Sequence, residues 1–315
     1  MERHILHIHD QALPPTPTSG GSNRLVDWLA KEQSLLGHMV SALSPQGHTT
    51  PYYQHILADI KQLDFQQLCQ LIPDSVTDIE YHGGLTAEIA HQLCQRYPRF
   101  ISVIHSTCGK TSPNRVYVSA SHARHHDDQR FIYNGVPVDE IEFSEDKKDY
   151  ALFLAKVKRS KKGVQDAIDI AKQTKHPLLI AGGRRFGSPE TWFPWHPSIK
   201  PLGYINGAQK QTIIKHAKAL WVPIRWEEPF GLTVVEAMLA GTPVIAYNRG
   251  AMKELIHHGV SGFVCDTKAE FIDALNLVDK LDPKIIRQHA LDNFSALKMA
   301  TAHLDMLTLA GSEPW

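Results

Sequence analysis

The sequence predicts an α/β protein with two Rossmann-like βαβ domains that face a cleft. The first observation is length, because 315 residues suffice for two domains of about 100–200 residues each. The second is that short apolar runs alternate with longer amphipathic stretches, which is typical of parallel sheets covered by helices. The third is the balance of 33 basic and 33 acidic side chains with 43% hydrophobic residues. This composition excludes a disordered chain and a strongly basic nucleic-acid binder.

The apolar runs define the strands in order along the chain. In the first half they predict strands over 4–8, 38–43, 78–82, 100–105, 116–119 and 131–133, with helices near 22–36, 54–71 and 85–97. The charged segment 138–149 is expected to be a solvated linker. In the second half they predict strands over 150–155, 177–181, 219–223, 243–246 and 262–265, followed by a mostly helical stretch over 283–310. We therefore expect a first domain over 1–142, a second over 143–292 and a terminal helical segment over 293–315.

Charge is distributed unevenly between the two halves. Residues 1–140 carry 10 basic and 14 acidic side chains, whereas 141–315 carry 23 and 19, so we expect an anionic ligand in the second half. The cysteines are widely spaced and form no C-x-x-C pair, which indicates reduced thiols. They are Cys69, Cys94, Cys108 and Cys265. No signal-peptide core and no run of about 18 apolar residues is present, which predicts a cytoplasmic protein without a transmembrane span, compatible with peripheral membrane contact.

The sharpest motif follows the third strand of the second half. It places Glu228 in a loop and Glu236 inside a helix that is apolar almost all round and therefore buried. A buried carboxylate needs a partner, and either a ligand hydroxyl or an internal polar network could supply it. The free amides of Phe230, Gly231 and Leu232 at the helix start would form an anion site. Two carboxylates beside a phosphate cradle fit a sugar at one end and a ribose at the other.

This motif, E-P-F-G-L-x-x-x-E-A-M-x-A-G-T-P-V-I-A, followed by N-R-G-A-M-K-E-L, resembles the E-x7-E signature of the family 4 retaining glycosyltransferases, which have the GT-B fold. The resemblance implies that Glu228 contacts the transferred sugar and that Glu236 binds the nucleotide ribose. It also implies that the first domain binds the acceptor, that the second binds the donor, and that the terminal helix crosses back to the first domain.

Two segments of the first half resemble the same family. Gly20 and Gly21 precede a helix and are similar to its glycine-rich loop, where glycines permit positive φ and close backbone approach to a phosphate or sugar. His105, followed by Ser106 and Thr107, ends a strand and resembles the His-Thr-Ser that lines the family's reaction centre. The resemblance therefore implies a catalytic role for His105.

A cationic segment follows the first strand of the second half. It contains five cations in seven residues and resembles the family's G-R-x5-K-G, which implies that Lys156 and Lys162 grip the donor diphosphate. Here Ala155 replaces the glycine and Lys156 the arginine, and a lysine offers a point charge instead of a bidentate fork. Further donor contacts are expected from Gly182, which follows a strand, and from Tyr204 and Ile205, which are similar to the stretch that meets the nucleotide base.

The resemblance implies a metal-independent, hexosyltransferase-type enzyme that moves a sugar from a nucleotide-diphosphate sugar to an acceptor hydroxyl, retaining configuration by front-face attack. The nucleotide-sugar is a substrate, so no cofactor is expected, and the acceptor would be a carbohydrate or lipid-linked glycan in glycan, lipopolysaccharide or exopolysaccharide synthesis. His7 and His9 share a strand face, but the sequence indicates no third metal ligand. A phosphorylase, a nucleotide-sugar epimerase and a catalytically silent subunit stay open as alternatives.

Overall fold

The computed structural model describes residues 2–16, 19–106 and 111–315. The chain divides into two compact units. Unit 1 consists of two segments, Met1–Pro137 and Phe294–Trp315, and unit 2 is the segment between them, Val138–Asn293. Each unit holds one six-stranded parallel sheet with helices, so the predicted α/β class is confirmed. Thr107 and Cys108 lie outside the described residues, and the other three cysteines are free thiols. Among the described helices, none is both long and apolar enough to cross a membrane.

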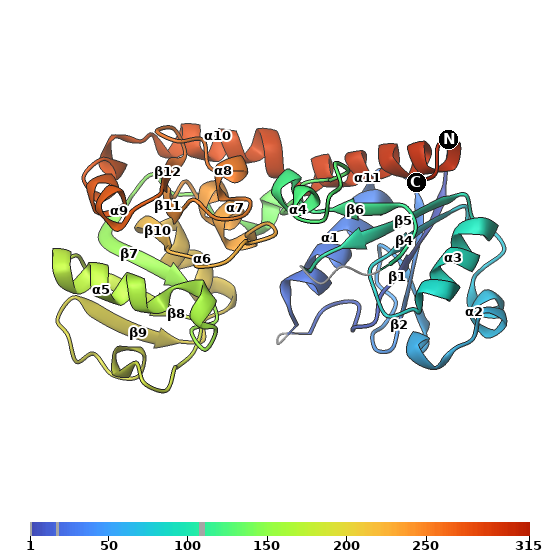
Figure 1. Cartoon of the computed structure of the whole chain (residues 1–315), viewed down its shortest axis with the longest axis horizontal. Helices are drawn as coiled ribbons and strands as arrows, with labels where there is room; N and C mark the ends of the chain where they lie inside the picture. The colour runs from blue at the N-terminus through green and yellow to red at the C-terminus, as the bar shows by residue number, and fades with distance from the viewer. Residues whose placement is uncertain (1, 17–18, 107–110) are drawn as a thin grey trace. The chain divides into compact units, whose positions relative to one another are not determined.

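Unit 1 contains one parallel sheet, and the C-terminal helix of the chain packs on it. Its strands are β1 (His4–Ile8), β2 (Met39–Ser44), β3 (Gln54–Leu57), β4 (Asp78–Tyr81), β5 (Arg99–Ile104) and β6 (Arg115–Tyr117), in the sheet order β3-β2-β1-β4-β5-β6. Its helices are α1 (Gly21–Leu35), α2 (Phe65–Leu71), α3 (Ala87–Arg96), α4 (Ala120–Arg124) and α11 (Ala296–Ser312). The C-terminal helix α11 packs against α1 and β5 (Figure 1).

Alternation along the strands divides the unit 1 core into two layers. Leu6, Ile8 and Phe100 point to the side that α2 and α3 cover. Ile101 and Val103 point to the other side, where residues of α11 pack on them. Because β1 is buried at all five positions, its histidines lie inside the fold and need internal hydrogen-bond partners.

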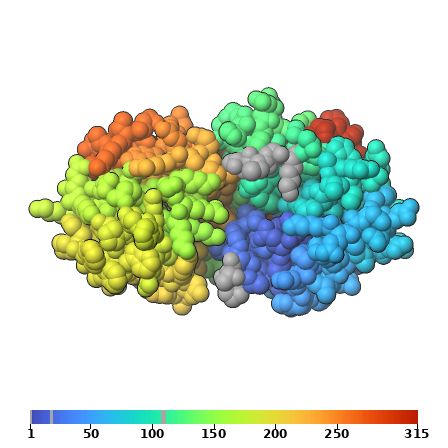
Figure 2. Space-filling view, turned by 60° about the horizontal axis from the view of Figure 1, so that its bottom comes forward, coloured from blue at the N-terminus to red at the C-terminus, as the bar shows by residue number. Residues whose placement is uncertain are grey.

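Unit 2 repeats this architecture. Its strands are β7 (Lys148–Leu154), β8 (Leu178–Ala181), β9 (Ile199–Gly203), β10 (Ala217–Val222), β11 (Val244–Tyr247) and β12 (Gly262–Cys265), in the sheet order β12-β11-β10-β7-β8-β9. Its helices are α5 (Val164–Thr174), α6 (Gly207–Lys215), α7 (Leu232–Leu239), α8 (Met252–Leu255), α9 (Lys268–Leu275) and α10 (Pro283–Phe294, whose last residue is counted in unit 1). Residues of α5 and α9 pack around Phe153 and Trp221, and α5 also contacts β9 (Figure 1). In Figure 2 the yellow-green and yellow parts of unit 2, which include α5 and β9, adjoin at the surface.

Two edge strands and one predicted strand differ from the sequence-based expectation. Residues 54–57 form β3 instead of the start of a helix, and β9 was not predicted. Both strands lie at a sheet edge, where pairing with a neighbour stabilises short polar segments and where the Pro201 of β9 is tolerated. Residues 131–133 do not form a strand, since only Phe131 makes a single bridge, to Tyr117.

The charged segment 138–149 is largely exposed to solvent, as expected from the sequence, but it is not a separate linker. It belongs to unit 2, and its last two residues begin β7. The ammonium of Lys147 donates to the carbonyl oxygens of Lys215 and Ala240 and to the hydroxyl of Thr242, at 2.7–3.2 Å. Burial lowers the pKa of Lys147 to about 8. The segment therefore anchors itself to unit 2 through backbone acceptors that the sequence does not reveal.

Candidate functional site

The sheet of unit 2 has a topological switch point between β7 and β10. From these two central strands the chain proceeds outward in opposite directions, to β8 and β9 on one side and to β11 and β12 on the other. Open parallel sheets bind ligands beyond the carboxyl ends of the strands that flank such a point. Lys162 follows β7 and Glu228 follows β10, so the topology brings these two predicted site residues together.

Glu228 is held by two donors at this edge. Its carboxylate forms an ion pair with the ammonium of Lys162, and its Oε2 accepts a hydrogen bond of 2.9 Å from the indole Nε1 of Trp226. The Lys161 ammonium lies 3.2 Å from the centroid of the Trp226 ring, an arrangement that favours a cation–π interaction. Both side chains of the ion pair are partly exposed, at 19% and 14%. The carboxylate is thus oriented before any ligand binds and stays accessible to one.

Glu236 lies in α7 and is 1% exposed, as its apolar surroundings predict. Its partner is Lys210 of α6, whose ammonium bonds both carboxylate oxygens, at 2.8 and 2.7 Å. Gly231 caps α7 with φ +113, and Leu232 is its first residue, so the helix starts at the last of the three residues whose amides were expected there. Phe230 is buried, whereas Gly231 and Leu232 are half-buried, so these two residues form the accessible part of the turn.

The other predicted donor contacts follow β7 and the two strands beside it, β8 and β9. Gly182 follows β8 with φ +122, and a Cβ there would lie 1.8 Å from the carbonyl oxygen of Ala155, so this position accepts only glycine. Tyr204 follows β9, is 74% exposed and lies against Gly183. Ile205 beside it is half-buried, and Lys156 after β7 is exposed. These residues and Glu228 therefore occupy the carboxyl ends of four adjacent strands in the order β10-β7-β8-β9.

In unit 1, the glycine pair lies at the start of α1. Gly20 is the residue before the helix and has φ −74, in the extended region, and Gly21 is the first helical residue. Neither glycine uses the positive φ that its residue type permits, because the chain enters this helix through an ordinary extended residue. A Cβ built on Gly20 would meet no atom within 4 Å, so the space before the helix is open among the described residues.

His105 follows β5, is half-buried and contacts a group of buried histidines. Its Nε2 lies 3.0 Å from Nδ1 of His82, and Nε2 of His82 lies 3.1 Å from Nδ1 of His7. Burial, and then the neighbouring His9, lower the pKa of His105 to about 3. Burial likewise lowers the pKa of His82 well below its ordinary value. At neutral pH these rings are uncharged and act as hydrogen-bond donors and acceptors instead of ion-pair partners.

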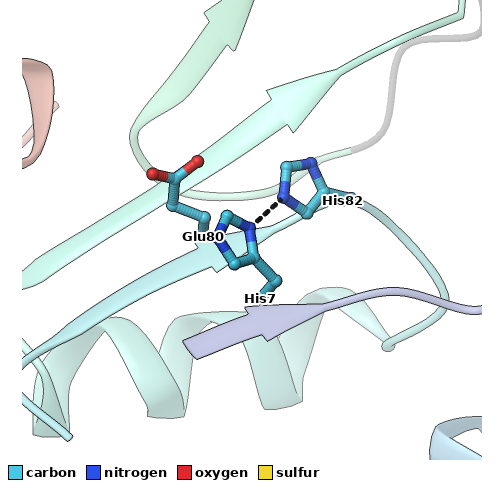
Figure 3. Close-up of side chains that lie close together, drawn as sticks. All are labelled: His7, Glu80 and His82. Carbon is cyan, nitrogen blue, oxygen red and sulfur yellow. Dashed lines mark hydrogen bonds between the residues drawn. The ribbon is translucent and has the colours of Figure 1, made fainter. Parts of the chain in front are cut away.

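A third residue near His7, which the sequence did not reveal, is Glu80 of β4. Atoms of His7, Glu80 and His82 that can ligate a metal lie within 4.8 Å of one another (Figure 3). His9, which shares a strand face with His7, lies outside this group. The sequence signal that was overlooked is alternation, since residues 80 and 82 point to the same side of β4 and Glu80 is the register partner of His7.

Other functional residues were also missed. Lys210, Trp226 and Gln33 carry no motif of their own. Lys210 of α6 bonds Glu236 of α7 and Gln33 of α1 bonds His7 of β1, so only the folded chain identifies these two residues. Trp226 lies in the same loop as its partner Glu228, two residues before it.

Comparison with known proteins agrees with this geometry. Residues 138–291, nearly all of unit 2, match the model of one family, described as glycosyl transferases group 1. Unit 2 is thus similar to group 1 glycosyl transferases. Among curated proteins, trehalose synthase of Thermococcus litoralis is 27% identical over 168 residues, which are 46% of this chain and 41% of that protein. The chain spans less than half the length of the curated relatives it matches.

Solved structures show that the fold extends over both units. The glycosyltransferase AviGT4, involved in avilamycin A biosynthesis, is similar with a TM-score of 0.76 and 19% identity, over 99% of both chains. The Anabaena protein HepE, solved in complex with UDP-glucose, is similar with a TM-score of 0.68 and 15% identity, over 97% of this chain and 99% of that one. The chain has the GT-B fold, which confirms the fold class implied by the sequence.

Proposed function

We propose that this protein is a metal-independent, retaining glycosyltransferase of family 4 that transfers a sugar from a nucleotide-diphosphate sugar to an acceptor hydroxyl. One observation carries the proposal. Two carboxylates, Glu228 and Glu236, each lie within ion-pair distance of a lysine at the ligand-binding edge of unit 2. Carboxylate oxygens accept hydrogen bonds, so the hydroxyls of a sugar and of a ribose are suitable donors to these two groups.

The reaction makes clear demands on these groups. Cleavage of the anomeric bond builds positive charge on the sugar and negative charge on the leaving diphosphate. Lys156, Lys162 and the N-terminal end of α7 would stabilise the diphosphate electrostatically. Glu228 would orient the sugar, Glu236 would bind the ribose, and the backbone after β9 would meet the base. The positions of Lys162 and Glu228 on either side of the switch point support this division of roles.

Unit 1 would bind the acceptor, a carbohydrate or a lipid-linked glycan of polysaccharide synthesis. Its own switch point lies between β1 and β4, and the open space before α1 follows β1 at that same edge. His105, at the end of β5, would bind a hydroxyl of the reacting sugars. The Anabaena protein that shares the fold was solved with UDP-glucose, which supports a nucleotide-sugar as the donor class.

The test combines binding and turnover. A thermal-shift screen against UDP-, GDP-, ADP- and CDP-sugars identifies the donor, and the expected result is stabilisation by one nucleotide class. Incubation of the labelled donor with candidate acceptors should then release a free nucleoside diphosphate and form a glycosylated product. A phosphorylase would leave the nucleotide-sugar intact and would release a sugar 1-phosphate only from a glycan incubated with inorganic phosphate. Interconversion of the sugar within the nucleotide-sugar would indicate an epimerase. Binding without turnover of any acceptor would favour a silent subunit.

A further inference from the structure

We propose that a buried hydrogen-bond chain anchored on Glu80 fixes the ring tautomer of His105 and makes its Nδ1 a hydrogen-bond acceptor. The chain runs from Glu80 through Gln33, His7 and His82 to His105. These intermediate side chains would be positioning residues, since they act on His105 and not on a substrate.

Strand alternation assembles the chain. His7 of β1 and Glu80 of β4 are register partners, and both point to the side of the sheet where α1 and α11 pack. His82 lies two residues after Glu80 and His105 two residues after Val103, so both keep that same side. Gln33 reaches these residues from α1, where it is completely buried.

The direction of the chain is set at Glu80, which is completely buried. Burial would raise the pKa of Glu80, but contact with His303 and the other donors outweighs burial and lowers it, so the carboxylate is ionised. It accepts hydrogen bonds from Nδ1 of His303 at 2.7 Å and from the amide Nε2 of Gln33 at 2.5 Å. Because an ionised carboxylate only accepts, the amide of Gln33 must turn its nitrogen toward it.

The amide then fixes each ring in turn. With its nitrogen on Glu80, Gln33 presents Oε1 to Nε2 of His7 at 2.8 Å, so that nitrogen must carry the proton. A neutral imidazole has one N–H, which leaves Nδ1 of His7 as the acceptor for His82 Nε2 at 3.1 Å. By the same reasoning Nδ1 of His82 accepts from Nε2 of His105 at 3.0 Å. His105 is left with an unprotonated Nδ1.

The chain of hydrogen bonds ends at that nitrogen. Nδ1 of His105 is buried and has no hydrogen-bond partner among the described residues. A buried acceptor without a hydrogen-bond partner is energetically costly. We therefore expect a bound molecule to supply a donor to this nitrogen. If the proposed function holds, that donor is a hydroxyl of a reacting sugar.

Metal binding by His7, Glu80 and His82 is the competing interpretation of the same residues. Both oxygens of Glu80 already accept hydrogen bonds, and in Figure 3 its carboxylate points away from the bond between the two histidines. A metal ion between the two rings would have to replace the His7–His82 hydrogen bond. The hydrogen-bond chain satisfies these groups without such rearrangement, and we therefore favour it.

The experiment measures tautomers directly. The full-length protein, labelled with ¹⁵N-histidine, is examined at pH 7.5 by long-range ¹⁵N–¹H correlation, and the His105 signals are assigned from their loss in His105→Gln. The expected pattern is a protonated Nε2 and an unprotonated Nδ1. Glu80→Gln removes the obligate acceptor with little change in shape, and Gln33→Met removes the relay; each should convert His105 to a mixture of tautomers.

His4→Gln is the matched control. His4 is a buried histidine of β1, the strand that also carries His7. Its ring bonds Ser75 and Ser41 and takes no part in the hydrogen-bond chain. Its replacement should leave the His105 signals unchanged. Circular dichroism measures whether each variant is folded. Because Glu80→Gln and Gln33→Met interrupt the chain at different points, either one tests the proposal if the other does not fold.

Three results would overturn the proposal. They are a protonated Nδ1 in the parent protein, His105 signals that are insensitive to both variants, and one equivalent of tightly bound metal by elemental analysis. The outcome is independent of the proposed function. A fixed tautomer together with unchanged sugar transfer by His105→Gln would retain the chain and reject the catalytic role of His105.

Discussion

The ammonium of Lys210 bonds both carboxylate oxygens of Glu236, at 2.8 and 2.7 Å, although the two residues lie on different helices. Glu236 is buried and Lys210 is 18% exposed. Both oxygens of the carboxylate that the family resemblance assigns to the ribose are therefore already bonded to an ammonium. Ribose hydroxyls would have to share Glu236 with this ammonium or displace it.

Removal of this lysine should destabilise unit 2. Lys210→Met removes the ammonium that bonds both oxygens of the buried Glu236 carboxylate, which we expect to lower the free energy of unfolding by about 3 kcal/mol. Urea denaturation measures the change. The control is Lys284→Met, because the ammonium of Lys284 pairs with Glu145 where both side chains are exposed, and such pairs contribute about 0–1 kcal/mol. Equal effects of the two substitutions would contradict the importance of burial.

Loss of either predicted donor-binding group should weaken nucleotide binding. Lys162→Ala removes charge beside the diphosphate and Glu236→Ala removes the ribose acceptor, and each should raise the Kd by about tenfold or more, equivalent to about 1.4 kcal/mol. Isothermal titration calorimetry with the donor's nucleoside diphosphate provides the measurement. Lys172→Ala serves as the control, since Lys172 lies in the last turn of α5 and pairs with Glu190. Unchanged affinity in both test variants would refute the donor-site assignment.

Gly163 should tolerate no side chain. It has φ +79, and a Cβ there would lie 1.7 Å from the carbonyl oxygen of Pro223, so Gly163→Ala must displace the backbone after β10. Gly187 provides the comparison, since it has φ +80 but a Cβ there would meet no atom within 4 Å. Gly187→Ala should cost about 1 kcal/mol of backbone strain and Gly163→Ala clearly more. Thermal unfolding distinguishes them, and similar melting temperatures would refute the steric argument.

Gly20 should matter for function and not for folding. Its φ of −74 suits any residue and its surroundings are open, so Gly20→Ala should leave the melting temperature unchanged. If a sugar or phosphate approaches the start of α1, the added methyl group should raise KM or lower kcat. The finding that would argue against this role is full activity of the variant at all substrate concentrations.

Unit 1 should lose stability as the pH falls below about 6.5. Burial lowers the folded-state pKa of His82 and His7, and lowers that of His105 to about 3. Below pH 6.5 the unfolded chain therefore binds more protons than the folded one, and the free energy of unfolding decreases with pH until the folded-state values are reached.

The size of this effect can be measured. One such ring that stays neutral in the fold should cost about 2 kcal/mol at pH 5. Urea denaturation between pH 7.5 and 5 follows the slope, and His82→Gln should make it shallower. A slope that is zero over this range would show that the histidines become protonated without unfolding.

Most of the architecture follows from local patterns in the sequence. The run His4–Ile8 is apolar enough to predict β1 with its exact bounds, and 262–265 likewise predicts β12. The edge strands β3 and β9 were missed, since their segments are polar or contain proline and acquire strand geometry only by pairing with a neighbour. Lys147 was misassigned because the carbonyl groups that bury it come from distant segments.

The sequence by itself determined which residue types occupy the carboxyl ends of the strands. Glu228, Lys162 and His105 were located from motifs that follow apolar runs. Tertiary structure alone decided their partners, because strand order places β7 beside β10, and β1 beside β4, across long stretches of chain. The pairing of Glu236 with Lys210 and the chain from Glu80 to His105 depend on the register of these strands and on the packing of α1 and α6. Hydrogen bonds of about 3 Å require that positional precision, and no local pattern of residues encodes it.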